Sequence, residues 1–215
     1  AALAAILPLR SHLDGPLSAV TVGAAGAWAA PAAAADLAGR RSVELGVPAT
    51  VTSDVVSAHA GALGGGPGAL LIAGTGAAAL GIDAVDGTCR TDRSDGDSGV
   101  VRGRAILVDG WGPELGDFGS GSWVGREALR AVLRSSVGLG PDTALTHAVS
   151  TRIGAPSGIQ GWLAQGDPLA RRLATLAPLV LDAAEAGDEV ADIIVSDAVR
   201  LLVASAVAAS SRGDD

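Results

Sequence analysis

The chain has 215 residues and lacks lysine, asparagine, methionine and tyrosine, so all 15 of its basic residues are arginine. It has one cysteine, Cys89. A single cysteine excludes a disulfide framework within one chain, and it excludes any iron–sulfur or zinc cluster built from the cysteines of one subunit. The absence of a disulfide framework favours an ordinary intracellular domain, and we expect a soluble cytoplasmic protein.

Long apolar runs are also missing. No stretch approaches the roughly 20 uninterrupted apolar residues of a membrane span, and the apolar opening AALAAILPLR is short, with no basic residue before it. It fits neither a signal peptide nor a membrane anchor. The net charge of −8 and the pI near 4.7 argue against nucleic acid or an anionic membrane as a partner. The length allows one large domain or two modest lobes.

The first sixty residues alternate between strand and helix patterns. LSAVTVGAAG (17–26) is β-branched and apolar and predicts a buried strand, and ATVTSD (49–54) predicts another. PAAAADLAGRRSVELG (31–46) has proline near its start and glycine at its end, as helices do. DVVSAHAGAL (54–63) predicts a helix opened by a capping Ser or Asp. This order indicates parallel α/β construction.

GGGPG (64–68) is the strongest break in the chain, and we expect a lobe boundary or hinge there. After it, ALLIAGTGAAALGI predicts two short strands around GTG, and RAILVDGWG predicts a further strand. The polar stretch from Asp86 to Gly103 between them is expected to be a surface loop.

From Ser120 onward the chain is expected to be almost entirely helical. Its best helix pattern is EVADIIVSDAVRLLVASAVAA (189–209).

The GTG triplet, Gly74, Thr75 and Gly76, follows a predicted strand. Glycines around a threonine make a tight turn whose amides and hydroxyl can hold phosphate oxygens, although a plain hairpin turn has the same pattern. GTGAAA also matches the G-x-G-x-x-A dinucleotide fingerprint. That fingerprint needs a long following helix, and the early arrival of Gly81 and Asp83 argues against one.

Asp54 falls where a strand ends and a helix begins, within TSDVVSAHAG. A carboxylate there can accept a proton from a substrate hydroxyl, as phosphoryl transfer to an alcohol requires. The alternative is an N-cap residue that only satisfies helix amides. Both interpretations stay open on the residues alone.

DGWGPELGDFGSG (109–121) is the densest candidate site. Trp111 between Gly110 and Gly112 offers an apolar platform for a sugar, and Asp117 can hydrogen bond to ring hydroxyls. The alternative is a Trp packed in the core with Asp117 capping the following helix. Because GDFGSGSWVG (116–125) leads directly into a helix pattern, its helix start is expected to present free amides close to a ligand.

No metal site is expected. His12, His59 and His147 are far apart and lack the spacing of metal ligands. The acidic cluster Asp92, Asp95 and Asp97 lacks the EF-hand pattern and predicts a solvated loop.

Three segments occur together and in order: TSDVVSAHAGA, LLIAGTGAAALG and DGWGPELGDFGSGSWVGREAL. In combination they resemble the N-acetylglucosamine kinase and BadF/BadG-type ATPase family, over roughly residues 49–133, and within it they resemble the actinobacterial glucosamine kinases. The resemblance implies an α/β actin-like ATPase (ribonuclease H-like) fold with two lobes. Residues 1–63 would be the remainder of the N-terminal lobe, and residues 64–215 the C-terminal lobe.

The resemblance also implies roles. Asp54 occupies the place of the catalytic base and sugar-binding carboxylate. Gly74, Thr75 and Gly76 occupy the second phosphate loop, which faces the nucleotide. Gly110, Trp111, Gly112 and Asp117 fall where the family holds its amino sugar, which makes this segment the sugar-side wall. The resemblance implies ATP with Mg²⁺ as the cofactor. The partners would be an amino sugar and a nucleotide, and the sequence leaves open whether the protein forms a homodimer.

Some parts of the family pattern differ. The N-terminal Asp-Gly-Gly-Gly-Thr phosphate loop and the C-terminal adenosine-binding Gly-Gly segment are not found, so we expect a chain incomplete at both ends and inactive alone. Phe118 stands where the family has an acidic residue, and Ala77 and Ala78 stand where Ser and Asn can follow GTG. Two alternative functions remain: an ATP-hydrolysing BadF/BadG-type activator, and a non-catalytic sugar-binding remnant.

Overall fold

The computed structural model describes residues 15–84, 103–166 and 168–210. The chain divides into two compact units, Ala1–Gly66 and Pro67–Asp215, here unit 1 and unit 2. Their boundary falls inside the GGGPG segment. The structure does not describe the predicted surface loop that begins at Asp86, except for Gly103 at its end. It also leaves out His12, Cys89, Asp92, Asp95 and Asp97.

Unit 1 is a small α/β unit. Its two strands, β1 (Val20–Gly23) and β2 (Ala49–Thr52), pair in parallel, with Val20 opposite Ala49. Between them runs α2 (Pro31–Leu45), which begins at a proline and is followed by the C-cap residue Gly46, with a left-handed φ of 69°. The helix α3 (Asp54–Leu63) follows β2 and buries His59. The predicted parallel order of strand and helix is confirmed.

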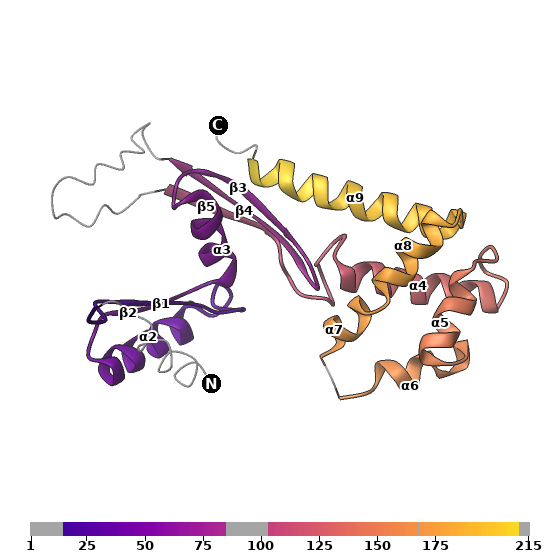
Figure 1. Cartoon of the computed structure of the whole chain (residues 1–215), viewed down its shortest axis with the longest axis horizontal. Helices are drawn as coiled ribbons and strands as arrows, with labels where there is room; N and C mark the ends of the chain where they lie inside the picture. Colours follow the sequence, from indigo (N-terminus) through magenta and orange to yellow (C-terminus); the bar gives the residue numbers. More distant parts are fainter. Residues whose placement is uncertain (1–14, 85–102, 167, 211–215) are drawn as a thin grey trace. The chain divides into compact units, whose positions relative to one another are not determined.

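Unit 2 begins with a three-stranded antiparallel sheet in the order β3-β4-β5. Its strands are β3 (Gly68–Ala73), β4 (Ala77–Ala84) and β5 (Gly103–Asp109), with Leu70 opposite Leu80 and Leu80 opposite Leu107. The C-terminal helix α9 (Glu189–Ser210) packs against all three strands (Figure 1). A Cβ at Gly81 would lie 2.0 Å from the carbonyl oxygen of Ala209, so a glycine is required for this close approach.

From Gly121 onward the described part of unit 2 is mostly helical, as the sequence predicts for the chain from Ser120 onward. The helices are α4 (Gly121–Ser136), α5 (Leu145–Ile153), α6 (Ile159–Leu163), α7 (Leu169–Ala174), α8 (Ala177–Glu185) and α9, with a 3₁₀ turn at Pro156–Gly158. They enclose one apolar cluster whose most deeply buried large side chains are Val132, Leu145, Val149, Ile159, Leu176 and Val180. This cluster fixes α4, the helix on which the candidate site is built.

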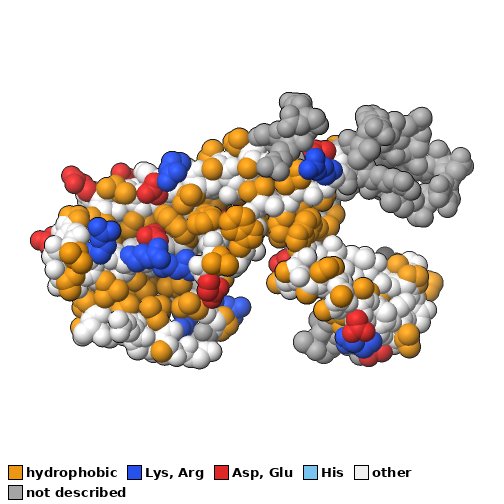
Figure 2. Space-filling model, turned by 180° about the vertical axis from the view of Figure 1, so that it is seen from behind, with side chains coloured by type: hydrophobic (Ala, Val, Ile, Leu, Met, Phe, Trp, Pro, Cys, Tyr) orange, Lys and Arg blue, Asp and Glu red, His pale blue; other side chains and the backbone are white. Residues whose placement is uncertain are grey.

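Among the described helices, α9 alone is long and apolar enough to cross a membrane by length and composition. It carries Asp192, Asp197 and Arg200, and it packs along the sheet and against α8 and α4. Part of it is exposed, including Val199, Val203 and Val207, and Figure 2 shows many apolar side chains on one face of this unit. Only 17% of the apolar part of α9 is buried, but a single helix of this length and composition is weak evidence for a membrane span, and the absence of a membrane partner remains a prediction.

Asp188, just before α9, ties two helices together. Its carboxylate accepts hydrogen bonds from the amide of Ala191 at 2.9 Å, and from the amide of Ala144 and the hydroxyl of Thr143 at the start of α5. Burial raises the pKa of this carboxyl, but the hydrogen bonds outweigh it, so the net shift of the pKa is downward from 3.8.

We expect Asp188→Ala to lower the free energy of unfolding by about 1–3 kcal/mol, because it removes a helix cap and charge-assisted hydrogen bonds. The lowered pKa means that this stabilisation is present above pH 3.8 and is lost as the pH falls through the folded-state pKa. Urea denaturation at pH 7 and at pH 3 measures both effects. A difference between wild type and Asp188→Ala that does not shrink at pH 3 would contradict this assignment.

Candidate functional site

The GTG triplet forms the turn between β3 and β4. The amide of Gly74 donates to the carbonyl of Gly76 at 2.9 Å, which closes the turn. Thr75 at its tip is exposed, and no residue in the described ranges hydrogen bonds with its hydroxyl. A strand and not a helix follows the glycines, so the dinucleotide fingerprint is excluded and a hairpin turn with an available hydroxyl remains.

The start of α4 is held against this turn. The amide of Gly121 donates to the carbonyl of Gly74 at 2.8 Å, and the amide of Ser122 donates to the carbonyl of Thr75 at 3.1 Å. The amide of Trp123 donates to the hydroxyl of Ser120, the N-cap residue, at 3.2 Å. The expectation that this helix start presents free amides is therefore wrong for its first turn, because the amides of Gly121 and Ser122 donate to the GTG turn and the amide of Trp123 donates to the N-cap residue.

Asp117 also contacts the turn. Its side chain is 8% exposed, and its Oδ1 accepts from the amide of Ala77 at 3.4 Å, a long hydrogen bond. A Cβ at Gly76 would lie 2.9 Å from Oδ2 of Asp117, so a side chain at position 76 would displace this carboxylate. Asp117 does not cap α4, since Ser120 does. The structure thus brings the predicted phosphate turn and the predicted sugar-side carboxylate into direct contact.

The pKa of Asp117 is raised above its ordinary value of 3.8. Burial is the largest cause, and the negative charges of Asp109 and Glu114 act in the same direction. The amide of Ala77 and the charge of Arg126 oppose the shift. A buried carboxylate with a raised pKa, in the loop between β5 and α4, is more typical of a functional position than of a structural one.

Trp111 is exposed and not packed in the core. Its side chain is 64% exposed, and its ring meets Phe118 edge to face, with the centroids 6.2 Å apart. Gly110 and Gly112 on either side have positive φ angles of 73° and 87°, which let the chain turn sharply around it. The core-packing alternative is wrong, and the aromatic face is available to a ligand.

Asp109 is a residue that the sequence reasoning did not single out. It is 2% exposed, and its two carboxylate oxygens accept from the amides of Asp117 at 2.8 Å and Phe118 at 2.7 Å. It ends β5 with a positive φ of 61°, unusual for a residue other than glycine. The available signal was an Asp-Gly pair at the end of an apolar strand.

Asp54 belongs to unit 1. It is the first residue of α3 and is exposed, and its Oδ1 accepts from the hydroxyl of Ser53 and the amide of Val55. Ser53 is the N-cap residue, so capping does not require Asp54. Among the described residues no hydrogen bond reaches Oδ2 of Asp54. This oxygen is available to a substrate hydroxyl.

An apolar hollow of about 250 Å³ adjoins the GTG turn. It is lined by Gly74, Gly121, Leu181, Val199 and Leu202, among others, from the end of β3 and from α4, α8 and α9. Leu181 and Val199 are about half exposed. The hollow therefore lies directly beside the predicted phosphate turn.

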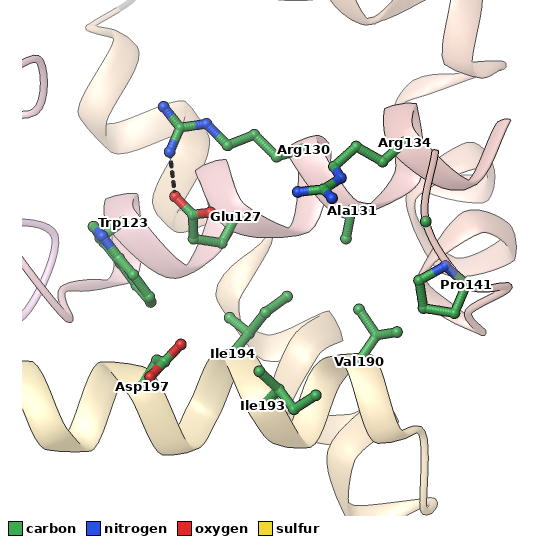
Figure 3. Close-up of a pocket in the computed structure, with 11 residues that line it drawn as sticks. Trp123, Glu127, Arg130, Ala131, Arg134, Pro141, Val190, Ile193, Ile194 and Asp197 are labelled. Carbon is green, nitrogen blue, oxygen red and sulfur yellow. Dashed lines mark hydrogen bonds and ion pairs between the residues drawn. The ribbon is translucent and has the colours of Figure 1, made fainter. Parts of the chain in front are cut away.

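A second hollow, of about 320 Å³, lies between α4 and α9 (Figure 3). Trp123, Ile194 and Val190 face into it, and the ion pair of Glu127 with Arg130 lies on its rim. It contains none of the predicted site residues.

In the described ranges no group of three or more His, Cys, Asp and Glu side chains could hold a metal ion.

Known proteins that match this chain in sequence and in structure carry the name N-acetylglucosamine kinase. The chain is 32% identical over 153 residues to the N-acetyl-D-glucosamine kinase of Dictyostelium discoideum, a match that covers 69% of this chain and 42% of that protein. A proposed N-acetylglucosamine kinase structure from Chromobacterium violaceum matches with a TM-score of 0.62 and 26% identity, over 77% of this chain and 52% of that one. The predicted resemblance to the N-acetylglucosamine kinases is confirmed.

A second structure of a proposed N-acetylglucosamine kinase, from Porphyromonas gingivalis, matches 96% of this chain and 64% of its own length with a TM-score of 0.68. At 22% identity it supports the fold alone. The α/β actin-like ATPase fold is thus confirmed. No protein-family model matches the chain. The chain spans less than half the length of the curated N-acetylglucosamine kinase relative.

Proposed function

We propose that the protein containing this chain transfers the γ-phosphate of ATP to a hydroxyl of an amino sugar, N-acetylglucosamine or glucosamine. The observation that carries the proposal is the contact between two predicted half-sites. The phosphate turn is hydrogen-bonded through Gly74 and Thr75 to the start of α4, and the sugar-side Asp117 accepts from Ala77 in the same turn. A sugar hydroxyl and a nucleotide phosphate would meet at this junction.

On the sugar side, Asp117 would accept hydrogen bonds from ring hydroxyls, and the exposed face of Trp111 would stack on the apolar face of the ring. Gly110 and Gly112 would let the sugar approach the backbone. Because the carboxylate of Asp117 is buried and its pKa is raised, it would accept a strong hydrogen bond from a ligand hydroxyl that replaces water.

On the nucleotide side, the hydroxyl of Thr75 and the backbone of Gly74 and Gly76 would contact phosphate oxygens. The apolar hollow beside the turn would take the base of the nucleotide. Mg²⁺ would supply charge neutralisation at the phosphates. Phosphoryl transfer depends mainly on such positioning and electrostatic stabilisation.

Asp54 would be the general base. As the sugar oxygen bonds to the γ-phosphorus and the bond to the bridging oxygen of ADP breaks, the proton of the attacking hydroxyl passes to Oδ2 of Asp54. In this scheme unit 1 is the remainder of the N-terminal lobe and unit 2 the C-terminal lobe. The segment 64–68 would be the hinge whose closure excludes water. The reaction fits a cytoplasmic protein with small-molecule partners.

The test is ADP release by the protein at its full length, with Mg·ATP, with and without N-acetylglucosamine. We expect release only with the sugar, and a decrease of roughly 10²- to 10⁴-fold in Asp54→Asn. Release that does not require sugar would support a BadF/BadG-type ATPase instead. Sugar binding without any release would support a non-catalytic sugar-binding protein.

A further inference from the structure

We propose that Asp109, at the end of β5, is a positioning residue that fixes the carboxylate of Asp117 against the GTG turn. The inference concerns the proposed sugar site and in that respect rests on the proposed function. Asp109 itself is 2% exposed and points into its own loop, so it is not a ligand contact.

The loop from Asp109 to Phe118 closes on the carboxylate of Asp109. One oxygen accepts from the amide of Asp117 at 2.8 Å and the other from the amide of Phe118 at 2.7 Å. These short bonds to a buried charge are the strong kind. Together they fix the backbone on both sides of the Asp117 side chain, so the place of this side chain depends on Asp109.

The surrounding residues leave the carboxylate of Asp109 little freedom. A Cβ at Gly116 would lie 2.3 Å from its Oδ1, and the amide of Gly116 donates to the carbonyl of Gly112 at 2.8 Å. Asp117 has a positive φ of 56°, a backbone conformation that an unsupported aspartate seldom adopts. The two amide contacts from Asp109 support this conformation.

The negative charge of Asp109 also acts on Asp117. Besides Asp109, the charged groups that influence Asp117 are Glu114 and Arg126. Asp109 and Glu114 raise the pKa of Asp117, and Arg126 lowers it. Neutralising Asp109 should therefore lower the pKa of Asp117, an effect that a purely packing role would not produce.

The experiment compares wild type with Asp109→Asn and Asp109→Gly. The control is Asp192→Asn, which removes one negative charge from the exposed face of α9. Asparagine and glycine both tolerate the positive φ at position 109. Asparagine keeps one acceptor and replaces the other with a donor, and glycine removes both. Amide exchange at Leu129 in the core of α4 reports whether each variant is folded.

NMR measures amide exchange and the titration of the Asp117 carboxyl, and calorimetry measures the Kd for N-acetylglucosamine. In wild type, the amides of Asp117 and Phe118 should exchange slowly. In both Asp109 variants they should exchange at least 10-fold faster, and the Asp117 carboxyl should titrate at lower pH. The Kd for N-acetylglucosamine should rise by roughly 10- to 100-fold, the loss expected from charged hydrogen bonds. Asp192→Asn should match wild type in all three.

Unprotected Asp117 and Phe118 amides in wild type would overturn the proposal without any variant. So would folded Asp109 variants with unchanged exchange, or with faster exchange and an unchanged Kd for the sugar. If wild type binds no sugar, the proposed function fails, and amide exchange and the Asp117 titration decide the positioning role independently.

Discussion

Asp117→Asn is expected to lose at least about 100-fold in affinity for N-acetylglucosamine without any loss of thermal stability at pH 7. Hydrogen bonds to a charged acceptor contribute roughly 1.5–3 kcal/mol each, and a sugar can donate two to one carboxylate. The variant keeps a carbonyl oxygen for the amide of Ala77, which is Asp117's long, weak partner at 3.4 Å. We therefore expect the substitution to weaken sugar binding without lowering the stability of the fold.

The stability half of this prediction follows from the sign of the pKa shift. Because the folded state raises the pKa of Asp117 above 3.8, the native protein holds this proton more tightly than the unfolded chain does. Stability therefore falls as the pH rises from 3.8 through the folded-state pKa, and the cost remains at neutral pH. An asparagine carries no such cost, so the Tm of Asp117→Asn should equal or exceed that of wild type at pH 7.

Calorimetric titration and thermal unfolding measure the two effects, and Asp192→Asn is the matched control for the charge. A variant that unfolds at a lower temperature would show that Asp117 is a structural residue. A variant that binds the sugar as tightly as wild type would remove Asp117 from the site.

Gly125→Ala is expected to lower the free energy of unfolding of unit 2 by about 3 kcal/mol. A Cβ at this position would lie 2.0 Å from the carbonyl oxygen and 2.7 Å from the carbonyl carbon of Leu173. Both atoms are backbone of α7, so no side chain can rotate away and the two helices must separate. The intrinsic preference of a helix for alanine, about 1 kcal/mol, opposes this cost without cancelling it.

Gly161→Ala in α6 is the matched control. It is also a helical glycine, but among the described residues no atom beyond its chain neighbours and the backbone of its own helix lies within 4 Å of its ideal Cβ. We expect it to raise the free energy of unfolding by about 0.5–1 kcal/mol, because alanine reduces the freedom of the unfolded chain. Urea denaturation followed by circular dichroism compares the two. Equal effects of the two substitutions would contradict the close crossing of α4 and α7.

The sequence predicts much of this arrangement where the signals are local. Pro31 and Gly46 set the ends of α2 through fixed backbone preferences, and the glycines of GTG set the hairpin turn. The resemblance to the N-acetylglucosamine kinases follows from three motifs in order. Each of these signals acts within a few residues, so the linear sequence is enough to find it.

The contacts that build the site depend on tertiary structure and could not be found in this way. Asp109 reaches amides 8 and 9 residues further along the chain because its loop folds back on it. The amides of Gly121 and Ser122 look free in the sequence because their acceptors are the carbonyls of a distant hairpin. Similarly, Asp117 precedes a helix and resembles a cap, but Ser120 takes that place.

The most direct measurement is a calorimetric titration of this chain with N-acetylglucosamine, repeated with glucosamine, with Mg·ATP and with Asp117→Asn. Saturable binding of an amino sugar that Asp117→Asn abolishes is the expected result, and it would establish that unit 2 carries the sugar-side wall. In a chain shown to be folded, absence of sugar binding, or binding that Asp117→Asn leaves unchanged, would contradict the site proposed here.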